Sequence, residues 1–422
     1  MLNVHPPVPN GRSKQWNEHF NTNARDLEKR RGLKQAKETM NYQTILSELE
    51  ASGNLRRLPE VTHEGRWIER EGQRMLNLSS NDYLGLATRS DLQAEFLASE
   101  AAQRWPLSSS SSRLLTGNFT VYTALEQRIA RDFGREAALL FNSGYHANTG
   151  ILPALADKQT LILADKLVHA SLIDGIRLGE APFSRYRHND YAQLERLLAK
   201  NTSTYETIIV VTESVFSMDG DVADLPRLVA LKRQYPNVML YVDEAHAIGV
   251  RGERGLGVAE ECGCIEQIDL LVGTFGKALA SMGAYVVCSE VIRSYLINKM
   301  RPLIFSTALP PLQIAWTQFL WERLPDWQAE REQLRMQSRR LAAALRGRGG
   351  EISDSHIVPF IVGDSRDCVL TAEQLQRKGF YCLPVRPPTV PQGTSRIRFS
   401  LTAAIQPEEI DRLIQVIGEE RS

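Results

Sequence analysis

The sequence lacks an excess of charge of either sign. Its 422 residues contain 50 basic and 50 acidic side chains, so the formal net charge at pH 7 is zero. Binding to nucleic acid or to an anionic membrane surface depends on an excess of positive charge. We therefore expect small-molecule substrates, with no nucleic acid and no membrane among the partners.

Long apolar runs are also missing. No stretch approaches the roughly 20 apolar residues that a membrane-spanning helix requires. The first residues, MLNVHPPVPN, lack the apolar core of a secretory signal. The sequence therefore predicts a cytoplasmic protein.

Cysteine is scarce and scattered. The sequence has only five, and the two that lie close together, Cys262 and Cys264, have a spacing unlike the CxxC pairs of zinc and redox sites. We expect free, reduced thiols and no bound metal.

The chain is long enough for several domains. Residues 1–40 are rich in proline and polar residues and show little apolar periodicity, which is typical of a flexible extension. Ile45, Leu46 and Leu49 recur at helical spacing, so an amphipathic helix is predicted from about Asn41 to near Gly53. The domain prediction is a flexible N-terminal extension (1–40), a helix and strand segment (41–90), a large domain (91–300) and a small C-terminal domain (301–422).

Short β-branched runs alternate with helical stretches through the predicted large domain. The runs are AALLFN, TLILAD, TIIVVTES, VMLYVDEA, LLVGTFG and AYVVC. This alternation is typical of an α/β fold with a mainly parallel sheet and helices on both faces. Ligands bind beyond the carboxyl ends of such strands, so Ser143, Glu213, Asp243 and Thr274 are expected to face one crevice. After residue 300 the pattern predicts a smaller α+β domain.

A lysine follows one of the buried strands directly. In LLVGTFGKAL the apolar run leads into Thr274, Gly276 and Lys277. Partial burial lowers the pKa of an amine, and such a lysine can form a Schiff base with an aldehyde. An isolated lysine in this position is more often a surface residue in a turn, so the interpretation depends on its neighbours.

The neighbouring motif YVDEAH carries Asp243 and His246 to the same crevice. A buried carboxylate needs a partner, and the protonated ring nitrogen of pyridoxal phosphate (PLP) is one such partner. The motif is also similar to the DExH box of helicases. A helicase would need the phosphate loop GxxxxGK followed by Ser or Thr, which the sequence does not contain.

Three further motifs lie after predicted strands. In FNSGYHANTG, Ser143 and Gly144 open a helix whose backbone N–H groups could bind a phosphate, although a glycine there is more often an ordinary turn. His169 in DKLVHASL could lie flat on a planar ring or be a structural histidine. Glu213 and Ser217 belong to TESVFSMDGD, which could also be a plain loop.

Taken together, nine motifs resemble the α-oxoamine synthases, a family of fold-type I PLP enzymes. They are SSNDYLGL, SRLLTGN, FNSGYHAN, DKLVHASL, TESVFSMDGD, VDEAHAIGV, GTFGKAL, FSTALPP and RPPTVPQGTSRIRFSLTAA, and the resemblance runs from about residue 42 to 419. It implies a seven-stranded, mainly parallel sheet in a large domain, a smaller C-terminal α+β domain, PLP as cofactor, and a homodimer. Ser306 and Thr307 are candidates for reaching the partner's phosphate site.

The resemblance also implies roles for individual residues. Lys277 would bind the cofactor as a Schiff base, Asp243 would pair with the ring nitrogen, His246 would bond the ring hydroxyl and His169 would stack on the ring. The phosphate would lie at Gly144, Tyr145 and Thr274, with Ser217 beside the ring. The substrates would contact Asn81, Arg398, Thr389 and Arg56. Arg386 would line the channel that holds the acyl group, as Thr389 does.

The reaction implied is a decarboxylative condensation of an amino acid with an acyl thioester. The segment RPPTVPQGTSRIRFSLTAA is most similar to members of the family that join L-alanine to a pimeloyl thioester in biotin biosynthesis. Alternatives are glycine C-acetyltransferase or another sibling, and, from another class, a non-catalytic binding subunit. The sequence departs from the family at Ser108–Ser112 and at Ala280–Met282, where glycines are usual, so the serine loop is expected to differ in shape.

Overall fold

The computed structural model describes residues 41–347, 353 and 355–419. The chain divides into two compact units, Met1–Arg57 and Leu58–Ser422. The described part of the first unit contains helix α2 (Tyr42–Ala51), whose N-cap Asn41 accepts hydrogen bonds from the N–H groups of Gln43 and Thr44. The helix predicted from the apolar spacing is confirmed. The predicted extension over residues 1–40 lies outside the described residues.

The second unit is built around a seven-stranded sheet in the order β4-β10-β9-β8-β7-β5-β6. Neighbouring strands from β6 to β9 run parallel, and β10 is antiparallel to both β9 and β4. This confirms the predicted mainly parallel α/β sheet. The strands are β4 (Ala137–Phe141), β5 (Thr160–Asp165), β6 (Phe183–Tyr186), β7 (Thr207–Glu213), β8 (Val238–Asp243), β9 (Leu270–Thr274) and β10 (Ala284–Cys288).

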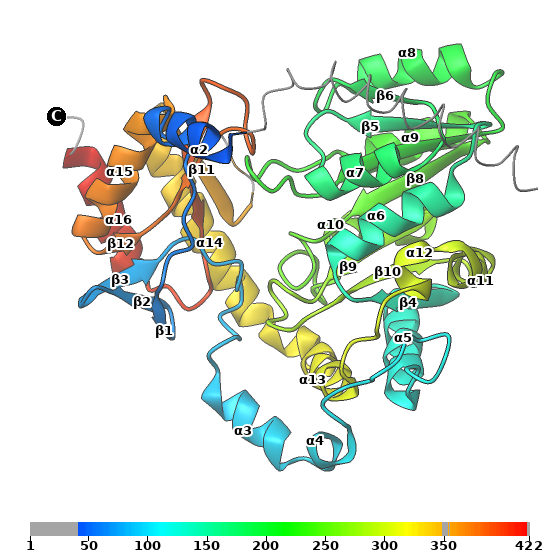
Figure 1. Ribbon diagram of the computed structural model, residues 1–422, viewed down its shortest axis with the longest axis horizontal. Coiled ribbons are helices and arrows are strands. Elements are labelled where there is room, and N and C mark those ends of the chain that lie inside the picture. The colour runs from blue at the N-terminus through cyan, green and yellow to red at the C-terminus, as the bar shows by residue number, and fades with distance from the viewer. Residues whose placement is uncertain (1–40, 348–352, 354, 420–422) are drawn as a thin grey trace, which may run out of the picture. The chain divides into compact units, whose positions relative to one another are not determined.

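Both faces of this sheet are covered. Every residue of β4, β5, β9 and β10 is buried, which requires protein on either side of the strands. Figure 1 shows the surrounding helices. They are α5 (Thr120–Asp132), α6 (Gly144–Leu155), α7 (Ala170–Leu178), α8 (Tyr191–Asn201), α9 (Leu225–Gln234), α10 (Val258–Glu261), α11 (Glu290–Lys299) and α12 (Arg301–Ile304), with a 3-10 turn at Ile265–Gln267.

The C-terminal part of the chain contains a smaller, antiparallel sheet with the strand order β11-β14-β13. The strands are β11 (Ile357–Gly363), β13 (Pro384–Val385) and β14 (Ser395–Ser400). The helices of this part are α14 (Gln328–Leu345), α15 (Ser365–Arg377) and α16 (Pro407–Glu419), whereas α13 (Pro311–Glu322) packs against α5 and leads into a 3-10 turn at Leu324–Trp327. In α16 the apolar residues repeat at helical spacing, and Ile410, Leu413, Val416 and Ile417 are buried.

A small sheet connects segments that are far apart in the sequence. Strands β1 (Thr62–Glu64), β2 (Trp67–Arg70) and β3 (Gln73–Asn77) form an antiparallel meander, and β3 pairs in parallel with β12 (Phe380–Tyr381). Two helices, α3 (Ser90–Ala98) and α4 (Glu100–Arg104), then lead toward the large sheet. The pairing with β12 fixes the motif that begins at Ser79 beside the C-terminal elements.

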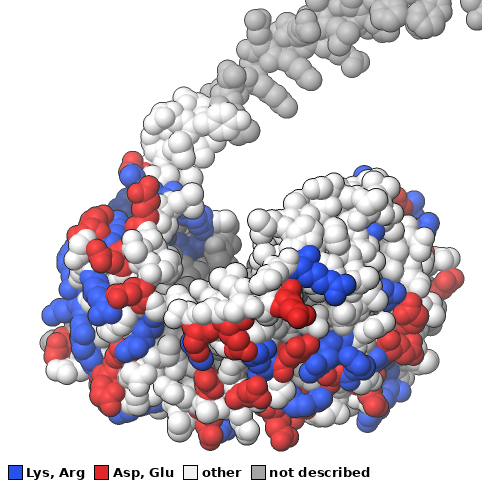
Figure 2. Space-filling view, turned by 90° about the horizontal axis from the view of Figure 1, so that it is seen from below, with Lys and Arg blue, Asp and Glu red and all other residues white. Residues whose placement is uncertain are grey.

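The distribution of surface charge and the polarity of the helices agree with what the composition predicts. On the face shown in Figure 2, basic and acidic side chains are interspersed, with no broad area of one sign. Among the described residues, no helix is both long enough and apolar enough to cross a membrane. All five cysteines are free, as predicted.

The serine loop takes a conformation that serine rarely adopts. Ser110 has φ of 51° and lies in the left-handed region that favours glycine. The backbone of this loop approaches itself closely at Gly117. A Cβ there would lie 2.4 Å from the carbonyl oxygen of Ser111. Ser110 therefore follows a glycine-like path at a conformational cost. The expected difference in shape from the loop of the family stays a prediction.

Candidate active site

The polar residues predicted to share a crevice end neighbouring strands of the large sheet. Glu213, the last residue of β7, lies opposite Asp243, the last residue of β8, and Asp243 lies opposite Val272 of β9. Carboxyl ends of parallel strands meet at one edge of a sheet. The register therefore places Glu213, Asp243 and the turn after β9 side by side.

Lys277 lies in the tight turn between β9 and β10. Backbone hydrogen bonds from Phe275 to Gly283 and from Ala280 to Lys277 close this turn. The Lys277 Nζ lies 3.0 Å from the Nε2 atom of His246. Burial lowers the pKa of Lys277 to about 8, although the carboxyl groups of Asp243 and Glu213 act in the opposite direction. With this pKa, about a tenth of the amine is unprotonated at pH 7, and the unprotonated form is the one that carbonyl chemistry requires.

His246 is buried and joins the lysine to the N-terminal motif. Its Nδ1 atom lies 2.6 Å from the hydroxyl oxygen of Tyr83, and burial together with Lys277 lowers its pKa well below the usual value. The imidazole is therefore neutral. One of its nitrogens faces the amine and the other faces the phenol.

Asp243 is held by two donors from its own fold. The Ala245 N–H donates to Oδ1 and the Asn148 side-chain amide donates to Oδ2, each at 2.8 Å. A carboxylate has about four acceptor positions, so these bonds fix its orientation and leave capacity for a further donor. The adjacent Glu213 is buried, and burial followed by the charge of Asp243 raises its pKa well above the usual value, so it is neutral at pH 7.

His169 is the N-cap of α7. Its Nδ1 atom accepts from the Ser171 N–H at 3.2 Å and lies 2.7 Å from the Ser171 hydroxyl. Burial lowers the pKa of His169, and the side chain retains an exposed surface. A neutral, partly exposed imidazole fixed at one nitrogen can stack on a planar ligand.

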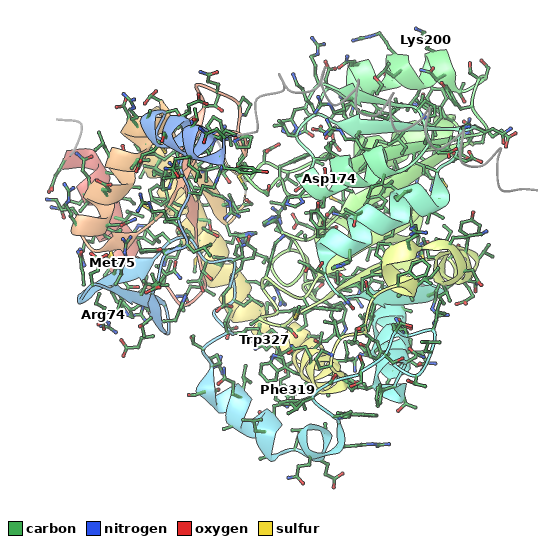
Figure 3. The ribbon with its side chains drawn as sticks, in the orientation of Figure 1. Arg74, Met75, Asp174, Lys200, Phe319 and Trp327 are labelled. Carbon is green, nitrogen blue, oxygen red and sulfur yellow. The ribbon has the colours of Figure 1, made fainter. Side chains whose placement is uncertain are left out.

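The first turn of α6 faces the same crevice. Ser143 caps the helix by accepting from the His146 N–H, and Gly144 and Tyr145 are its first residues. Free N–H groups at a helix N-terminus bind anions such as phosphate. Thr274 lies nearby, because a Cβ at Gly144 would be 3.9 Å from the Thr274 Cβ. The Tyr145 side chain is 51% exposed and its hydroxyl donates to Asp174 at 2.6 Å; Figure 3 labels Asp174 on α7.

Arg398, on β14, reaches across to the large sheet. Its guanidinium donates to the Ser217 carbonyl oxygen, to Asn81 Oδ1 at 3.3 Å and to the Tyr83 hydroxyl at 3.2 Å. These acceptors are neutral, and no carboxylate of the described residues forms an ion pair with Arg398. Its positive charge is therefore available to an anionic ligand group.

A cavity of about 410 Å³ lies between α14 and residues 250–261, lined by His356 and several arginines. Another cavity, of about 380 Å³, lies next to Ser217 and is also lined by Thr389, Phe216, His188 and Arg396. We assign the second one to the site, because it adjoins the group that Arg398 binds, whereas the first reaches the site only through the contact of His356 with Tyr83.

The roles predicted for Arg56, Arg386, Ser306 and Thr307 stay predictions. Arg56 belongs to the first compact unit, just after α2. Arg386 is half-buried beside β13. The carbonyl oxygen of Thr307 accepts from the Asn142 side chain at 2.7 Å, and Ser306 is half-buried next to it.

Two residues of the site were not singled out from the sequence. Tyr83 joins His246, Asn81 and Arg398 through its hydroxyl. Asn148 binds Asp243 from the middle of α6. A polar residue at the start of the apolar stretch TGILPAL was the available signal for Asn148. Tyr83 is an aromatic residue among hydrophobic neighbours and gave no signal of its own. Among the described residues no cluster could hold a metal ion.

Comparison with known proteins agrees with this geometry. Residues 73–417 match the family model described as aminotransferase class I and II. A putative 8-amino-7-oxononanoate synthase of Pasteurella multocida is 62% identical over 380 residues, which cover 90% of this chain and 98% of that protein. The 8-amino-7-oxononanoate synthase of Haemophilus ducreyi is 60% identical, covering 87% of this chain and 97% of that protein.

Two solved enzyme structures have a similar fold. A serine palmitoyltransferase from S. paucimobilis with a bound PLP–myriocin aldimine has a TM-score of 0.83 and 30% identity, and covers 90% of this chain and 96% of that chain. An 8-amino-7-oxononanoate synthase from Francisella tularensis has a TM-score of 0.69 and 26% identity, and covers 82% of this chain and 98% of that chain.

Proposed function

The chain belongs to the α-oxoamine synthases of the class I and II aminotransferase family, and on this premise we propose that it makes 8-amino-7-oxononanoate. The reaction joins L-alanine to a pimeloyl thioester, with release of coenzyme A or the carrier protein and of carbon dioxide, and belongs to biotin biosynthesis. The observation that carries the proposal is the pairing of a partly unprotonated Lys277 with the oriented carboxylate of Asp243, at one edge of the large sheet.

The residues fit pyridoxal phosphate in three respects. Lys277 offers an amine of lowered pKa for the aldehyde, and Asp243 retains acceptor capacity for a protonated ring nitrogen. The N-terminus of α6, at Gly144 and Tyr145, offers N–H groups for the phosphate. Thr274 lies beside it, with its hydroxyl donating to the Gly283 carbonyl oxygen. When bound, the cofactor supplies an electron sink that stabilises negative charge at the amino-acid Cα.

Lys277 is assigned the proton transfers at Cα. The Lys277 amine would accept the proton from the substrate Cα and later return one. The neutral His246, 3.0 Å from Nζ, keeps a polar partner beside this amine without adding charge. Asp243, held by Ala245 and Asn148, would face the ring nitrogen.

His169, His246 and Ser217 are assigned to the cofactor ring. His169, fixed by its bond with Ser171, would stack on the ring. His246 would bond the ring hydroxyl, and Ser217, whose carbonyl oxygen accepts from Arg398, would lie beside the ring.

Arg398 and Asn81 are assigned to the amino-acid substrate. A planar guanidinium binds a carboxylate through two parallel hydrogen bonds, and Arg398 has no competing carboxylate among its bonded neighbours in the described residues. Holding the carboxylate in this way orients the Cα–H bond for attack by Lys277, which is a positioning effect.

The acyl group is assigned to the cavity of about 380 Å³ that Ser217 and Thr389 share. Thr389 lines it directly, whereas Arg386 and Arg56 are proposed to meet more distant parts of the acyl thioester. We further propose a cytoplasmic homodimer, with Ser306 and Thr307 directed to the partner's phosphate site. The five free cysteines favour a reducing compartment.

The proposal is tested by measuring thiol release from pimeloyl-coenzyme A in the presence of L-alanine and PLP. We expect Lys277→Ala to abolish release, because no other amine of the described site can replace it, while its unfolding temperature stays close to that of the wild-type apoprotein. Lys299→Ala, which removes an exposed lysine at the end of α11, is the matched control and should retain full activity. Wild-type activity in Lys277→Ala would contradict the assignment.

A further inference from the structure

A chain of buried hydrogen bonds beneath the site centres on Asn148. This residue is 2% exposed and lies on α6, one turn after Gly144. Its side-chain amide donates to Asp243 Oδ2 at 2.8 Å and to the Ser171 hydroxyl at 3.0 Å. One side chain therefore contacts both the strand end that carries Asp243 and the helix that His169 caps.

The direction of these bonds is fixed by Tyr241. The Tyr241 hydroxyl donates to Asn148 Oδ1 at 2.6 Å, and burial raises the pKa of Tyr241 well above its usual value, so the phenol stays protonated. Because Oδ1 is the acceptor of this bond, the NH₂ group of Asn148 must face Asp243 and Ser171. The flipped amide would place its oxygen against a carboxylate.

The same direction determines the proton of His169. Since Asn148 donates to the Ser171 oxygen, the Ser171 hydroxyl is free to donate to His169 Nδ1, 2.7 Å away. The Ser171 N–H also donates to Nδ1. Nδ1 is then an acceptor, and the neutral imidazole carries its proton on Nε2.

Close packing of two helices holds Asn148 in place. A Cβ at Gly175 on α7 would lie 2.2 Å from the carbonyl oxygen of Asn148, so only glycine lets the helices approach this closely. Ser171 is fully buried beside this contact. The backbone of Asn148 therefore cannot shift without displacing α6 from α7, and its side-chain amide is held by the bonds to Tyr241, Asp243 and Ser171.

We propose that Asn148 is a positioning residue for cofactor binding, which orients the Asp243 carboxylate toward the ring nitrogen and fixes the His169 tautomer. This inference rests on the proposed function, because it concerns the residues assigned to the PLP ring. Asn148 acts through Asp243 and His169 and contacts no reacting atom itself.

The dissociation constant of PLP, measured by absorbance or fluorescence titration of the apoprotein, tests this role without any turnover. We expect Asn148→Ala to raise it at least tenfold, because Asp243 loses its donor. We expect Asn148→Asp to raise it more at pH 8 than at pH 6, because two facing carboxylates repel when both are ionised and can share a proton as the pH falls.

Two further variants make the result decisive. Tyr241→Phe leaves Asn148 in place but frees its amide to flip, and should weaken PLP binding less than Asn148→Ala does. Asn237→Asp alters an asparagine that bonds the carbonyl groups of Thr202 and Tyr205 away from the site, and should leave the variant-to-wild-type ratio at 1 at both pH values. The unfolding temperature of each apoprotein shows whether it folds.

The outcomes separate this inference from the proposed function. If the wild-type protein fails to bind PLP, the proposed function fails. If the wild type binds PLP and folded Asn148→Ala and Asn148→Asp bind it equally well, or if the Asn148→Asp ratio does not change with pH, the positioning role is overturned while the proposed function stands.

Discussion

At the scale of single residues, the site depends on charge states that burial sets. Burial lowers the pKa of Lys277 to about 8, keeps His246 neutral and raises the pKa of Glu213 well above its usual value. Each shift follows from the cost of burying charge. Together with the hydrogen bonds of Asp243, they place an amine of lowered pKa and an oriented carboxylate at neighbouring strand ends.

Most of these residues could be predicted from the sequence, because each lies at or shortly after the end of a recognisable strand. Asp243 ends one apolar run, His246 follows it, and Lys277 follows another. Tyr83 and Asn148 were not singled out, because their roles come from contacts with residues more than 90 positions away. The polar Asn148 beside an apolar stretch was a local signal, whereas Tyr83 gave none.

The serine loop allows a test of backbone strain at one residue. Ser110 has φ of 51°, and its exposed side chain bonds only Ser108. Ser110→Gly should raise the unfolding free energy by about 0.5–1 kcal/mol, because glycine adopts positive φ without a Cβ clash. Thermal and urea unfolding measure the change.

Ser112→Gly is the matched control for this substitution. Ser112 lies in the same loop but is not among the described residues with positive φ. Its replacement should lower stability, because glycine adds freedom to the unfolded chain without relieving strain. Equal effects of the two substitutions would show that Ser110 is not strained.

At the scale of elements, six of the seven strands of the large sheet were predicted, including the edge strand β4 but not the edge strand β6. The six apolar runs named from the sequence are strands of this sheet. Its edge strand β6 was not predicted, because FSRY is short and its first three residues are not buried. Strands β1, β2 and β3 are also partly exposed, so they lack the apolar signal of the central strands.

Connections between elements also depend on charged contacts that the sequence does not reveal. His188, after β6, lies 2.9 Å from Asp165 at the end of β5 and 2.7 Å from Asp221 in the loop after β7. Burial lowers the pKa of His188, but hydrogen bonds to both carboxylates outweigh it and raise the pKa to about 10. The imidazolium therefore links three loops at the edge of the acyl cavity.

This contact predicts a pH-dependent contribution to stability. The folded pKa of His188, about 10, lies above the unfolded value of about 6.5. The stabilisation is therefore fully present below about pH 6.5 and is lost as the pH rises toward 10. His188→Gln should lower the unfolding temperature most at pH 6, and the difference from wild type should shrink steadily up to pH 10.

The control for this series is His63→Gln, which replaces an exposed histidine of β1. Its unfolding temperature should follow that of the wild type at every pH. A His188→Gln difference that is constant from pH 6 to pH 10 would mean that the histidine is not charged in the folded protein.

At the scale of the whole molecule, substrate binding requires two parts of the second unit to act together. Lys277 and Asp243 come from the large sheet, whereas Arg398 comes from β14 of the C-terminal sheet and Asn81 from the segment after β3. The bonds of Arg398 to Ser217 and Asn81 join these parts. The fold class was predictable from alternating strands and helices, but this meeting of distant segments was implied only by family resemblance.

The proposed homodimer can be checked by the mass of the protein in solution. We expect light scattering after size-exclusion chromatography to give about twice the chain mass of 47.5 kDa, at protein concentrations used for assays. Several large apolar side chains are exposed on the single chain, including Leu115 and Phe305, which a partner subunit would cover. A stable monomer with full activity would contradict the dimer.

The most direct test of the account is a substrate matrix with product identification by mass spectrometry. L-alanine, glycine and L-serine would each be paired with pimeloyl-, acetyl-, succinyl- and palmitoyl-coenzyme A in the presence of PLP. The account predicts 8-amino-7-oxononanoate from L-alanine and the pimeloyl thioester, with much slower turnover of every other pair. Preferred turnover of a different pair would contradict the proposed substrates. The proposed activity would be contradicted if no pair were turned over and L-alanine did not react with a pimeloyl carrier protein either.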